Sequence, residues 1–303
     1  MSRPDAAGPP RDALLPLRFE GVGLALRGVP ILSGLDFELS AGGCSVVLGP
    51  NGSGKTMLLR VGHGLLAPTA GRVRWCGPGA RGTGDDRKRG TADDRKRGTG
   101  DDRKRGTGGD RRRGTGDDRR RGTGDDRRRG TGDDRALRLR AQAMVLQRPV
   151  LLRRRVRANL AYPLRLRGVA TPERRARVAA VLEQTHLEAL ADRPARSLSV
   201  GEQQRVAVAR AWVVEPEVLW LDEPASALDP GATRELEETV RRIRASGTKV
   251  VMTTHDLGQA RRLADEVLFL HRGRVVEKTP AGEFFDEPRS VEGRAFLKGE
   301  LLP

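Results

Sequence analysis

A glycine-rich stretch in the first quarter of the chain carries residues suited to binding a phosphate chain. The apolar run Val46 to Leu48 leads into Gly49, four further residues and then Gly54-Lys55-Thr56, which is the pattern G-x-x-x-x-G-K-[ST] between a predicted strand and a predicted helix. Residues with small side chains let backbone N–H groups close around a polyphosphate, and the helix dipole adds its positive end. The predicted loop consists of Gly49, Pro50, Asn51, Gly52, Ser53, Gly54, Lys55 and Thr56.

Two side chains of this loop supply specific chemistry. Lys55 can reach the β- and γ-phosphates, and the Thr56 hydroxyl can ligate Mg²⁺. The alternative is a glycine-rich turn that merely allows tight packing of a strand on a helix. Because the complete pattern occurs in the strand–loop–helix setting, we expect the chain to bind a nucleoside triphosphate.

Carboxylates follow a second apolar run. Residues 218–221 predict a buried strand, and Asp222 and Glu223 follow it directly. Asp222 is placed to hold Mg²⁺, directly or through water, and Glu223 to position the water that attacks the γ-phosphate in line. Since acidic pairs after apolar strands are common, this pair acquires meaning only together with the phosphate loop.

Three further polar residues lie at predicted element boundaries. Gln147 ends a predicted strand and is a candidate Mg²⁺ or water ligand, whereas His255 follows the strand 249–252 and is a candidate γ-phosphate contact. Ser199 precedes a predicted helix whose N-terminus offers this side chain and backbone N–H groups to an anion. The plain alternatives are a strand-end histidine and an ordinary helix cap.

The elements that must position these residues follow from the hydrophobic pattern. Strands and helices alternate after residue 200, which indicates a parallel sheet covered on both faces. Thr171 and Pro172 are interpreted as the N-cap and first turn of a helix. The predicted strands are 17–20, 22–26, 35–39, 46–48, 73–75, 143–146, 217–221, 248–253 and 266–270, and the predicted helices after the loop helix are 156–167, 171–190, 200–214, 230–245 and 256–264.

Composition excludes several classes of protein. In 303 residues, the apolar runs are far shorter than the ~20 residues that cross a bilayer, and acidic and proline residues interrupt the N-terminus where a signal peptide would be apolar. The two cysteines, Cys44 and Cys76, favour a reducing compartment and small buried side chains over a metal site or disulfide.

The formal charge of +17 is concentrated in an unusual segment. Residues 81–135 repeat an RGTGDDRK-like octapeptide and carry 20 Lys and Arg against 13 Asp, which accounts for +7. Having almost nothing apolar to bury, this insert is predicted to be a disordered polyampholyte. One interpretation is a basic arm for nucleic acid or acidic lipid. We favour a tandem duplication tolerated in a surface loop, because paired aspartates weaken phosphate binding.

Taken together and in this order, the motifs resemble the ATP-binding-cassette (ABC) ATPases. The stretches 254–266 and 273–277 and the tail 284–300 are similar to importer ATPases for oxyanions, most closely the tungstate type, with the molybdate and phosphate types next. The resemblance covers about residues 17–299 apart from the repeat. The corresponding motifs are Walker A at 49–56, the Q-loop at Gln147, the signature at 198–202, Walker B at 218–223, the D-loop at 226–229 and the H-loop at His255.

The resemblance implies a P-loop α/β fold with a mainly parallel central sheet, an antiparallel β subdomain and a helical subdomain. It divides the chain into an N-terminal tail (1–16), the ATPase domain (17–299), the insert within it (79–135) and a helical signature subdomain (150–215). It also implies hydrolysis of ATP with Mg²⁺, with Glu223, His255 and Gln147 in catalysis, Ser199 and Gly201 on the nucleotide, and Thr56, Gln147 and Asp222 on the metal.

The implied partners are a second copy or sister ATPase across the ATP sites, a membrane permease that contacts residues 148–155 and, indirectly, an extracytoplasmic solute-binding protein. The implied location is the cytoplasmic face of the membrane, and no specific nucleic acid is expected. The alternatives are an exporter-type ATPase and a soluble cassette protein acting on nucleic acid or ribosomes.

Two departures from the family pattern stand out. Val200 lies where glycine is usual. Leu26 lies in place of an adenine-stacking aromatic, which predicts weaker base binding.

Overall fold

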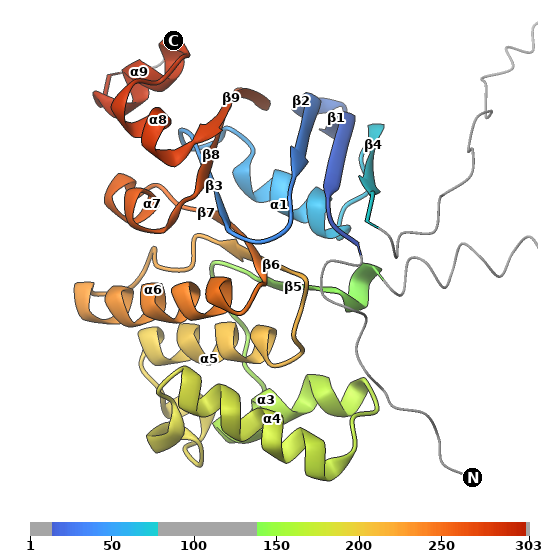
Figure 1. Cartoon of the computed structure of the whole chain (residues 1–303), viewed down its shortest axis with the longest axis vertical. Helices are drawn as coiled ribbons and strands as arrows, with labels where there is room; N and C mark the ends of the chain where they lie inside the picture. The colour runs from blue at the N-terminus through green and yellow to red at the C-terminus, as the bar shows by residue number, and fades with distance from the viewer. Residues whose placement is uncertain (1–13, 78–137, 301–303) are drawn as a thin grey trace, which may run out of the picture.

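The computed structural model describes residues 14–77 and 138–300. The predicted insert and residues 1–13 of the predicted tail lie outside these ranges. Figure 1 shows a six-stranded sheet through the middle of the molecule, a smaller sheet and α1 (Lys55–His63) on one side of it, and the remaining helices on the other. This is the predicted fold class. Its two antiparallel features are the smaller sheet and one edge of the six-stranded sheet.

The six-stranded sheet has the order β5-β6-β7-β3-β8-β9 and is parallel except at its β8–β9 edge, where the strands pair antiparallel. The loops that leave the carboxyl ends of β3, β5, β6 and β7 therefore emerge at one edge, where ligands bind in open α/β sheets. The strands are β3 (Cys44–Leu48), β5 (Gln142–Val145), β6 (Val218–Asp222), β7 (Lys249–Thr253), β8 (Glu266–His271) and β9 (Arg274–Pro280).

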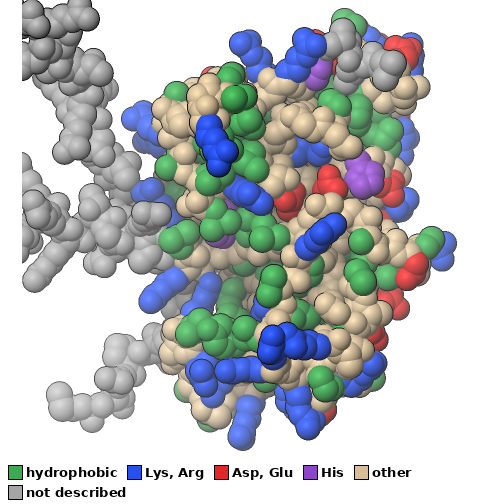
Figure 2. All heavy atoms as spheres, turned by 180° about the vertical axis from the view of Figure 1, so that it is seen from behind, with side chains coloured by type: hydrophobic (Ala, Val, Ile, Leu, Met, Phe, Trp, Pro, Cys, Tyr) green, Lys and Arg blue, Asp and Glu red, His purple; other side chains and the backbone are tan. Residues whose placement is uncertain are grey.

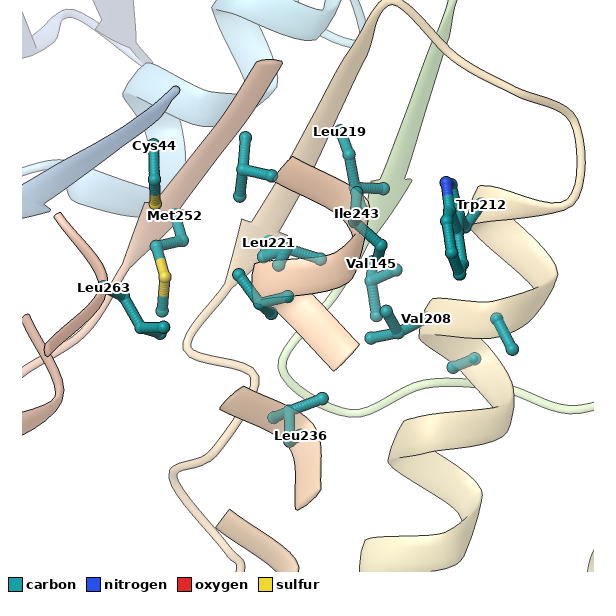
Figure 3. Packing of buried hydrophobic residues seen from close by; sticks show 14 of the residues in the cluster. Cys44, Val145, Val208, Trp212, Leu219, Leu221, Leu236, Ile243, Met252 and Leu263 are labelled. Carbon is teal, nitrogen blue, oxygen red and sulfur yellow. The ribbon is translucent and has the colours of Figure 1, made fainter. Parts of the chain in front are cut away.

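The sheet separates two hydrophobic cores, because successive side chains of a strand point to opposite faces. On β3, Val46 and Leu48 belong to one core and Val47 to the other. Figure 3 shows the larger core, in which Leu219 and Leu221 of β6 lie among side chains from the helices. The strands are apolar on both faces because both faces are covered.

The smaller core lies between the main sheet and the antiparallel sheet β2-β1-β4. This sheet is formed by β1 (Leu17–Leu26), β2 (Val29–Leu39) and β4 (Ala70–Trp75), and α1 packs between the two sheets. The sequence pattern predicts two strands within 17–26, whereas the structure has one strand with register shifts between Phe19 and Val22 and again before Ala25.

The larger core is covered by seven helices among the described residues. They are α3 (Val156–Leu166), α4 (Thr171–Gln184), α5 (Val200–Trp212), α6 (Pro230–Ala245), α7 (Leu257–Leu263), α8 (Ala281–Asp286) and α9 (Val291–Leu297), and short 3-10 turns Glu188–Leu190 and Ala195–Ser197 precede α5. Arginine and lysine side chains are scattered over the face in Figure 2, many of them on its lower part, with hydrophobic side chains between them.

Several local predictions require correction. Thr171 is not an N-cap: Ala170 holds that position without a side-chain bond, and the Thr171 hydroxyl accepts from Arg174 instead. The fold also begins before residue 17. Leu14 and Leu15 are buried in the smaller core, and Leu14 N donates to Glu217 Oε2 at 3.0 Å. Apolar contact therefore anchors a segment that its prolines and glycines suggested was a tail.

The contact between α1 and β6 allows a test of the smaller core. An ideal Cβ on Gly62 would lie 2.4 Å from Cη2 of the buried Trp220 ring, so Gly62→Ala forces a shift of one element. We expect a loss of about 1–3 kcal/mol in the free energy of unfolding, the usual cost of overpacking. Gly282→Ala on α8 is the control because its Cβ would meet nothing within 4 Å. Equal urea-unfolding midpoints for the two variants would contradict this packing.

Candidate functional site

The predicted phosphate loop leaves β3 and enters α1 at the carboxyl edge of the main sheet. Gly54 caps α1 with φ 103°, a conformation that glycine adopts without strain. An ideal Cβ on Gly49 would lie 2.0 Å from Leu270 O, so only glycine allows the loop to pass this close to β8. Backbone sterics thus require the glycines at both ends of the loop. The N–H groups in the first turn of α1 have no partner within the helix and are available to a ligand in the loop.

Lys55 lies across the loop. Its Nζ donates to Gly49 O at 2.9 Å and to Pro50 O at 3.1 Å, and the residue is 6% exposed. Burial lowers the pKa of the Lys55 ammonium, while the charges of Glu223 and Asp222 act to raise that pKa. The loop therefore holds a cation where phosphate oxygens would meet its backbone N–H groups.

Asp222 joins the loop to the strand ends. Its Oδ1 accepts from Thr56 Oγ1 and from Thr253 Oγ1, each at 3.0 Å, and the Thr253 hydroxyl in turn accepts from Glu223 N at 2.8 Å. The hydroxyl and the carboxylate are hard oxygen ligands of the kind that Mg²⁺ prefers, and they lie next to the predicted phosphate site. The donor set present here therefore fits a magnesium ion.

Glu223 lies close to two further predicted site residues. Gln147 Nε2 donates to Glu223 Oε2 at 3.2 Å and to Ser226 Oγ at 3.2 Å, and His255 Nδ1 lies 3.4 Å from Glu223 Oε2. Glu223 has φ 43°, which is strained for a residue with a side chain. Such strain persists where the surrounding structure holds it and gathers at functional sites. Three residues predicted from separate strand ends are thus brought together.

The structure does not bring Ser199 to this cluster. Ser199 begins α5, which belongs to the larger core, whereas α1 lies in the smaller core across the main sheet. The Ser199 hydroxyl accepts from Glu202 N at 3.2 Å, and Ser199 N donates to Glu202 Oε2 at 2.7 Å, which is a complete capping box. One chain therefore places the helix that follows the phosphate loop and the helix that begins at Ser199 on opposite faces of its sheet.

Gly201 and Val200 differ in exposure. Gly201 is buried, and an ideal Cβ there would lie 2.7 Å from Ala232 Cβ, so the glycine allows α5 to pack closely on α6. The absence of a side chain at Gly201 is therefore required by helix packing, and only the backbone of this residue is left for the predicted anion contact. Val200, at the first position of α5, is 61% exposed beside Ser199.

Thr253 is a residue of the candidate site that sequence reasoning missed. It pairs in register with Asp222 on the adjacent parallel strand and bonds both that carboxylate and the Glu223 backbone. A hydroxyl residue at the end of an otherwise apolar strand, next to the strand that carries two carboxylates, is the signal that could have identified it.

The tip of the hairpin between β1 and β2 is a further part of the candidate site. Leu26 and Val29 are paired across the strands there and are 42% and 59% exposed. Strand β2 lies against the phosphate loop, because an ideal Cβ on Gly54 would be 2.9 Å from Leu32 Cδ2. An exposed apolar tip next to the loop is suited to contact a nucleotide base without stacking on it.

This arrangement predicts that an aromatic ring at the tip strengthens nucleotide binding. Leu26→Tyr should tighten ATP binding by about 2- to 10-fold, which corresponds to the ~0.5–1.5 kcal/mol of an aromatic stack. Displacement of a fluorescent ATP analogue measures the Kd. Leu65→Tyr, at an exposed leucine just after α1, is the control. An unchanged or weaker Kd for Leu26→Tyr would place the base elsewhere.

The fold and the loop together define a nucleoside triphosphatase of the P-loop class. Comparison with known proteins narrows this class, since residues 32–96 and 119–226 match the family model described as ABC transporter. The chain belongs to this family, and it is an ATPase that uses ATP with Mg²⁺.

Individual relatives agree with this assignment. The chain is 33% identical over 277 residues to a methionine import ATP-binding protein of Rhodococcus jostii, covering 91% of this chain and 68% of that protein. It is 35% identical to a nickel import ATP-binding protein of Rhodobacter capsulatus, with 92% and 95% covered. The solved structure of cbiO1 from Clostridium perfringens, part of the ABC transporter complex cbiONQ, superposes with TM-score 0.68 at 24% identity, covering 89% of this chain and 90% of that one, and supports the fold.

Proposed function

We propose that this chain is the ATP-binding subunit of an importer and energises solute uptake through a separate membrane permease. The relatives named above are import ATP-binding proteins, which supports this direction of transport. The observation that carries the proposal is a connection between the hydrolysis cluster, formed by Glu223, Gln147 and His255, and an apolar hollow on the surface. Gln147 makes this connection, because it belongs to the cluster and is followed by a segment that lines the hollow.

The hollow has a volume of about 450 Å³ and lies beside the segment that follows Gln147. Val150 on its rim is 80% exposed and Leu166 is 66% exposed, so apolar side chains face outward here. Because Gln147 itself bonds Glu223 and Ser226, a partner seated in the hollow acts on the hydrolysis cluster through a short length of backbone. The residues that line the hollow and carry this argument are Leu146, Pro149, Val150, Leu152, Tyr162 and Leu166.

Two copies of the chain, or one copy with a sister ATPase, are required for complete sites in this proposal. Ser199 of one copy faces the nucleotide held by the phosphate loop of the other, because a single chain separates these features across its sheet. ATP at the seam holds two surfaces together, and cleavage of its terminal phosphate releases them.

Within each site, the proposed roles follow the contacts. Lys55 and the loop N–H groups bind the phosphates, and Glu223 orients the attacking water with Gln147 and His255 beside it. Thr56, Gln147 and Asp222 would hold Mg²⁺, which when bound neutralises charge on the phosphates. Gly201 contributes only through its backbone.

The proposed solute is an oxyanion. Relatives described as phosphate import ATP-binding proteins, such as that of Natronomonas pharaonis with 41% identity over 169 residues (52% of this chain and 59% of that protein), support an oxyanion. The methionine, nickel and Fe(3+) importers among the relatives do not. We therefore propose an oxyanion, with tungstate first and molybdate or phosphate next, delivered by an extracytoplasmic binding protein.

The proposed location is the cytoplasmic face of the membrane, held there by the permease. Among the residues that the structure describes, no helix combines the length and the apolar character that a bilayer crossing demands. The permease would supply that crossing.

The proposal is tested by co-purification and transport. The full chain is expressed with candidate permease subunits from the same source, and Val150→Asp should abolish co-purification of the one that binds, without changing ATP binding. Val291→Asp on α9, at a valine that is 69% exposed, is the matched control. Reconstituted complex should take up one of tungstate, molybdate, sulfate or phosphate when its binding protein is present. Retained binding of the Val150 variant, or ATP-driven efflux in place of uptake, contradicts the proposal.

The octapeptide insert is predicted to be dispensable for hydrolysis. Deleting residues 81–133 should leave the ATPase rate within about twofold, because long surface insertions cost little and the repeat offers nothing to bury. Steady-state phosphate release measures the rate. A large loss would show an active role for the repeat, and salt-sensitive nucleic-acid binding that the deletion removes would favour a basic arm.

A further inference from the structure

An ion pair joins α6 to α7, the helix that follows His255 in the chain. Glu237 on α6 accepts from Arg262 Nε at 2.9 Å and from Arg262 Nη2 at 2.7 Å, and over a longer distance of 3.4 Å from Arg241 Nη2 on its own helix. The Glu237 side chain is only 3% exposed. A buried carboxylate is costly unless it is paired, and the two-point arginine contact is a strong and directional pairing. The pair therefore holds α6 and α7 in one relative position.

The Arg262 guanidinium also reaches back to the first turn of α7. An ideal Cβ on Gly258 would lie 3.1 Å from Arg262 Nη1 and 3.1 Å from Asp256 Oδ1. Asp256 is the N-cap of α7, and its Oδ1 accepts from Gln259 N at 2.9 Å. Arg262 Nη1 thus lies beside Gly258 in the first turn of α7, the helix that follows His255.

His255 depends on this turn for its position. Its side chain is 58% exposed, and its recorded contact among the described residues is the one with Glu223 Oε2 at 3.4 Å. A side chain that is not enclosed by packing is placed chiefly by its backbone. The backbone at His255 is fixed on one side by β7 and on the other by the first turn of α7.

We propose that Glu237 is a positioning residue for ATP hydrolysis, which acts through Arg262 and the first turn of α7 to hold His255 against Glu223. This inference rests on the role proposed above for His255. Glu237 touches neither nucleotide nor metal in this account. Its removal loosens the geometry of hydrolysis and leaves the phosphate loop intact.

A double-mutant cycle tests this assignment on the full chain. Glu237→Gln keeps the shape of the side chain and removes its charge, so kcat should fall about 10-fold, below the ~10²-fold that a 1 Å misplacement can cost. The Kd for ATP should stay within about twofold. In a His255→Ala background the same substitution should change the residual rate by less than about twofold, because coupled residues are not additive. Single-turnover cleavage of radiolabelled ATP measures the slow rates.

The controls separate the possible failures. Glu238→Gln removes contacts to Arg242 at 3.2 Å and to Arg241 at 3.4 Å on the same helix, neither of which involves α7, and should leave kcat unchanged. If Glu237→Gln does not fold, Arg262→Lys, which keeps the cation but loses the two-point contact, is judged by the same cycle. Equal effects in both backgrounds, or an unchanged kcat, overturn the role of Glu237. A normal rate for His255→Ala alone refutes instead the proposed role of His255.

Discussion

Glu223→Gln should reduce ATP turnover by about 10²-fold or more while leaving ATP binding intact. The substitution keeps the size of the side chain, and the amide can still contact Gln147. It loses the carboxylate that we propose positions the attacking water. Glu223 is the one residue that contacts both Gln147 and His255 among the described hydrogen bonds and ion pairs, at 3.2 and 3.4 Å.

The measurements are single-turnover phosphate release and equilibrium binding of ATP with Mg²⁺. Glu238→Gln on α6 is the control, since it removes a carboxylate of the same type from an exposed helix face. Hydrolysis at the normal rate would show that another group positions the water. Loss of ATP binding together with turnover would show that Glu223 serves the structure of the site.

Lys55→Ala should weaken ATP binding by about 10²-fold or more and abolish nucleotide-dependent association of two chains. Lys55 Nζ donates two bonds to loop carbonyls, at 2.9 and 3.1 Å, and is the cation within the phosphate loop. Charge-assisted hydrogen bonds are worth about 1.5–3 kcal/mol each, so losing the ammonium removes both loop order and phosphate contacts.

Isothermal titration with ATP and Mg²⁺ measures the affinity, and light scattering measures association. Lys298→Ala, at a side chain that is 68% exposed beyond α9, is the matched control. Unchanged association of the Lys55 variant in saturating ATP would contradict a seam that is closed by nucleotide.

The sequence predicted the strands of the central sheet, and it singled out Gln147, Glu223 and His255, which the structure brings together. The run 46–48 is apolar since both faces of β3 are covered, and the loop glycines are required by backbone approach at Gly49 and Gly54. Gln147, Glu223 and His255 were each noted near predicted strand ends, and the family resemblance grouped them before the fold was seen.

What the sequence did not predict depends on contacts between distant segments. The edge strand β9 and the helices α8 and α9 have short or mixed apolar patterns, and they form because they cover the sheet edge and the larger core. The burial of Leu14 and Leu15 relies on a partner more than 200 residues away. The Glu237–Arg262 pair likewise joins two helices through side chains whose spacing carries no motif.

The separation of Ser199 from the phosphate loop leads to the most direct test of the account. Light scattering of the Glu223→Gln chain with ATP and Mg²⁺ should show twice the mass of the 33.0 kDa monomer. Adding Ser199→Arg should leave ATP bound to the loop with unchanged affinity but keep the chain at monomer mass, because the second copy no longer accepts the nucleotide. A doubled mass for this variant, or monomer mass for the Glu223→Gln chain with ATP bound, would contradict a site shared between two copies.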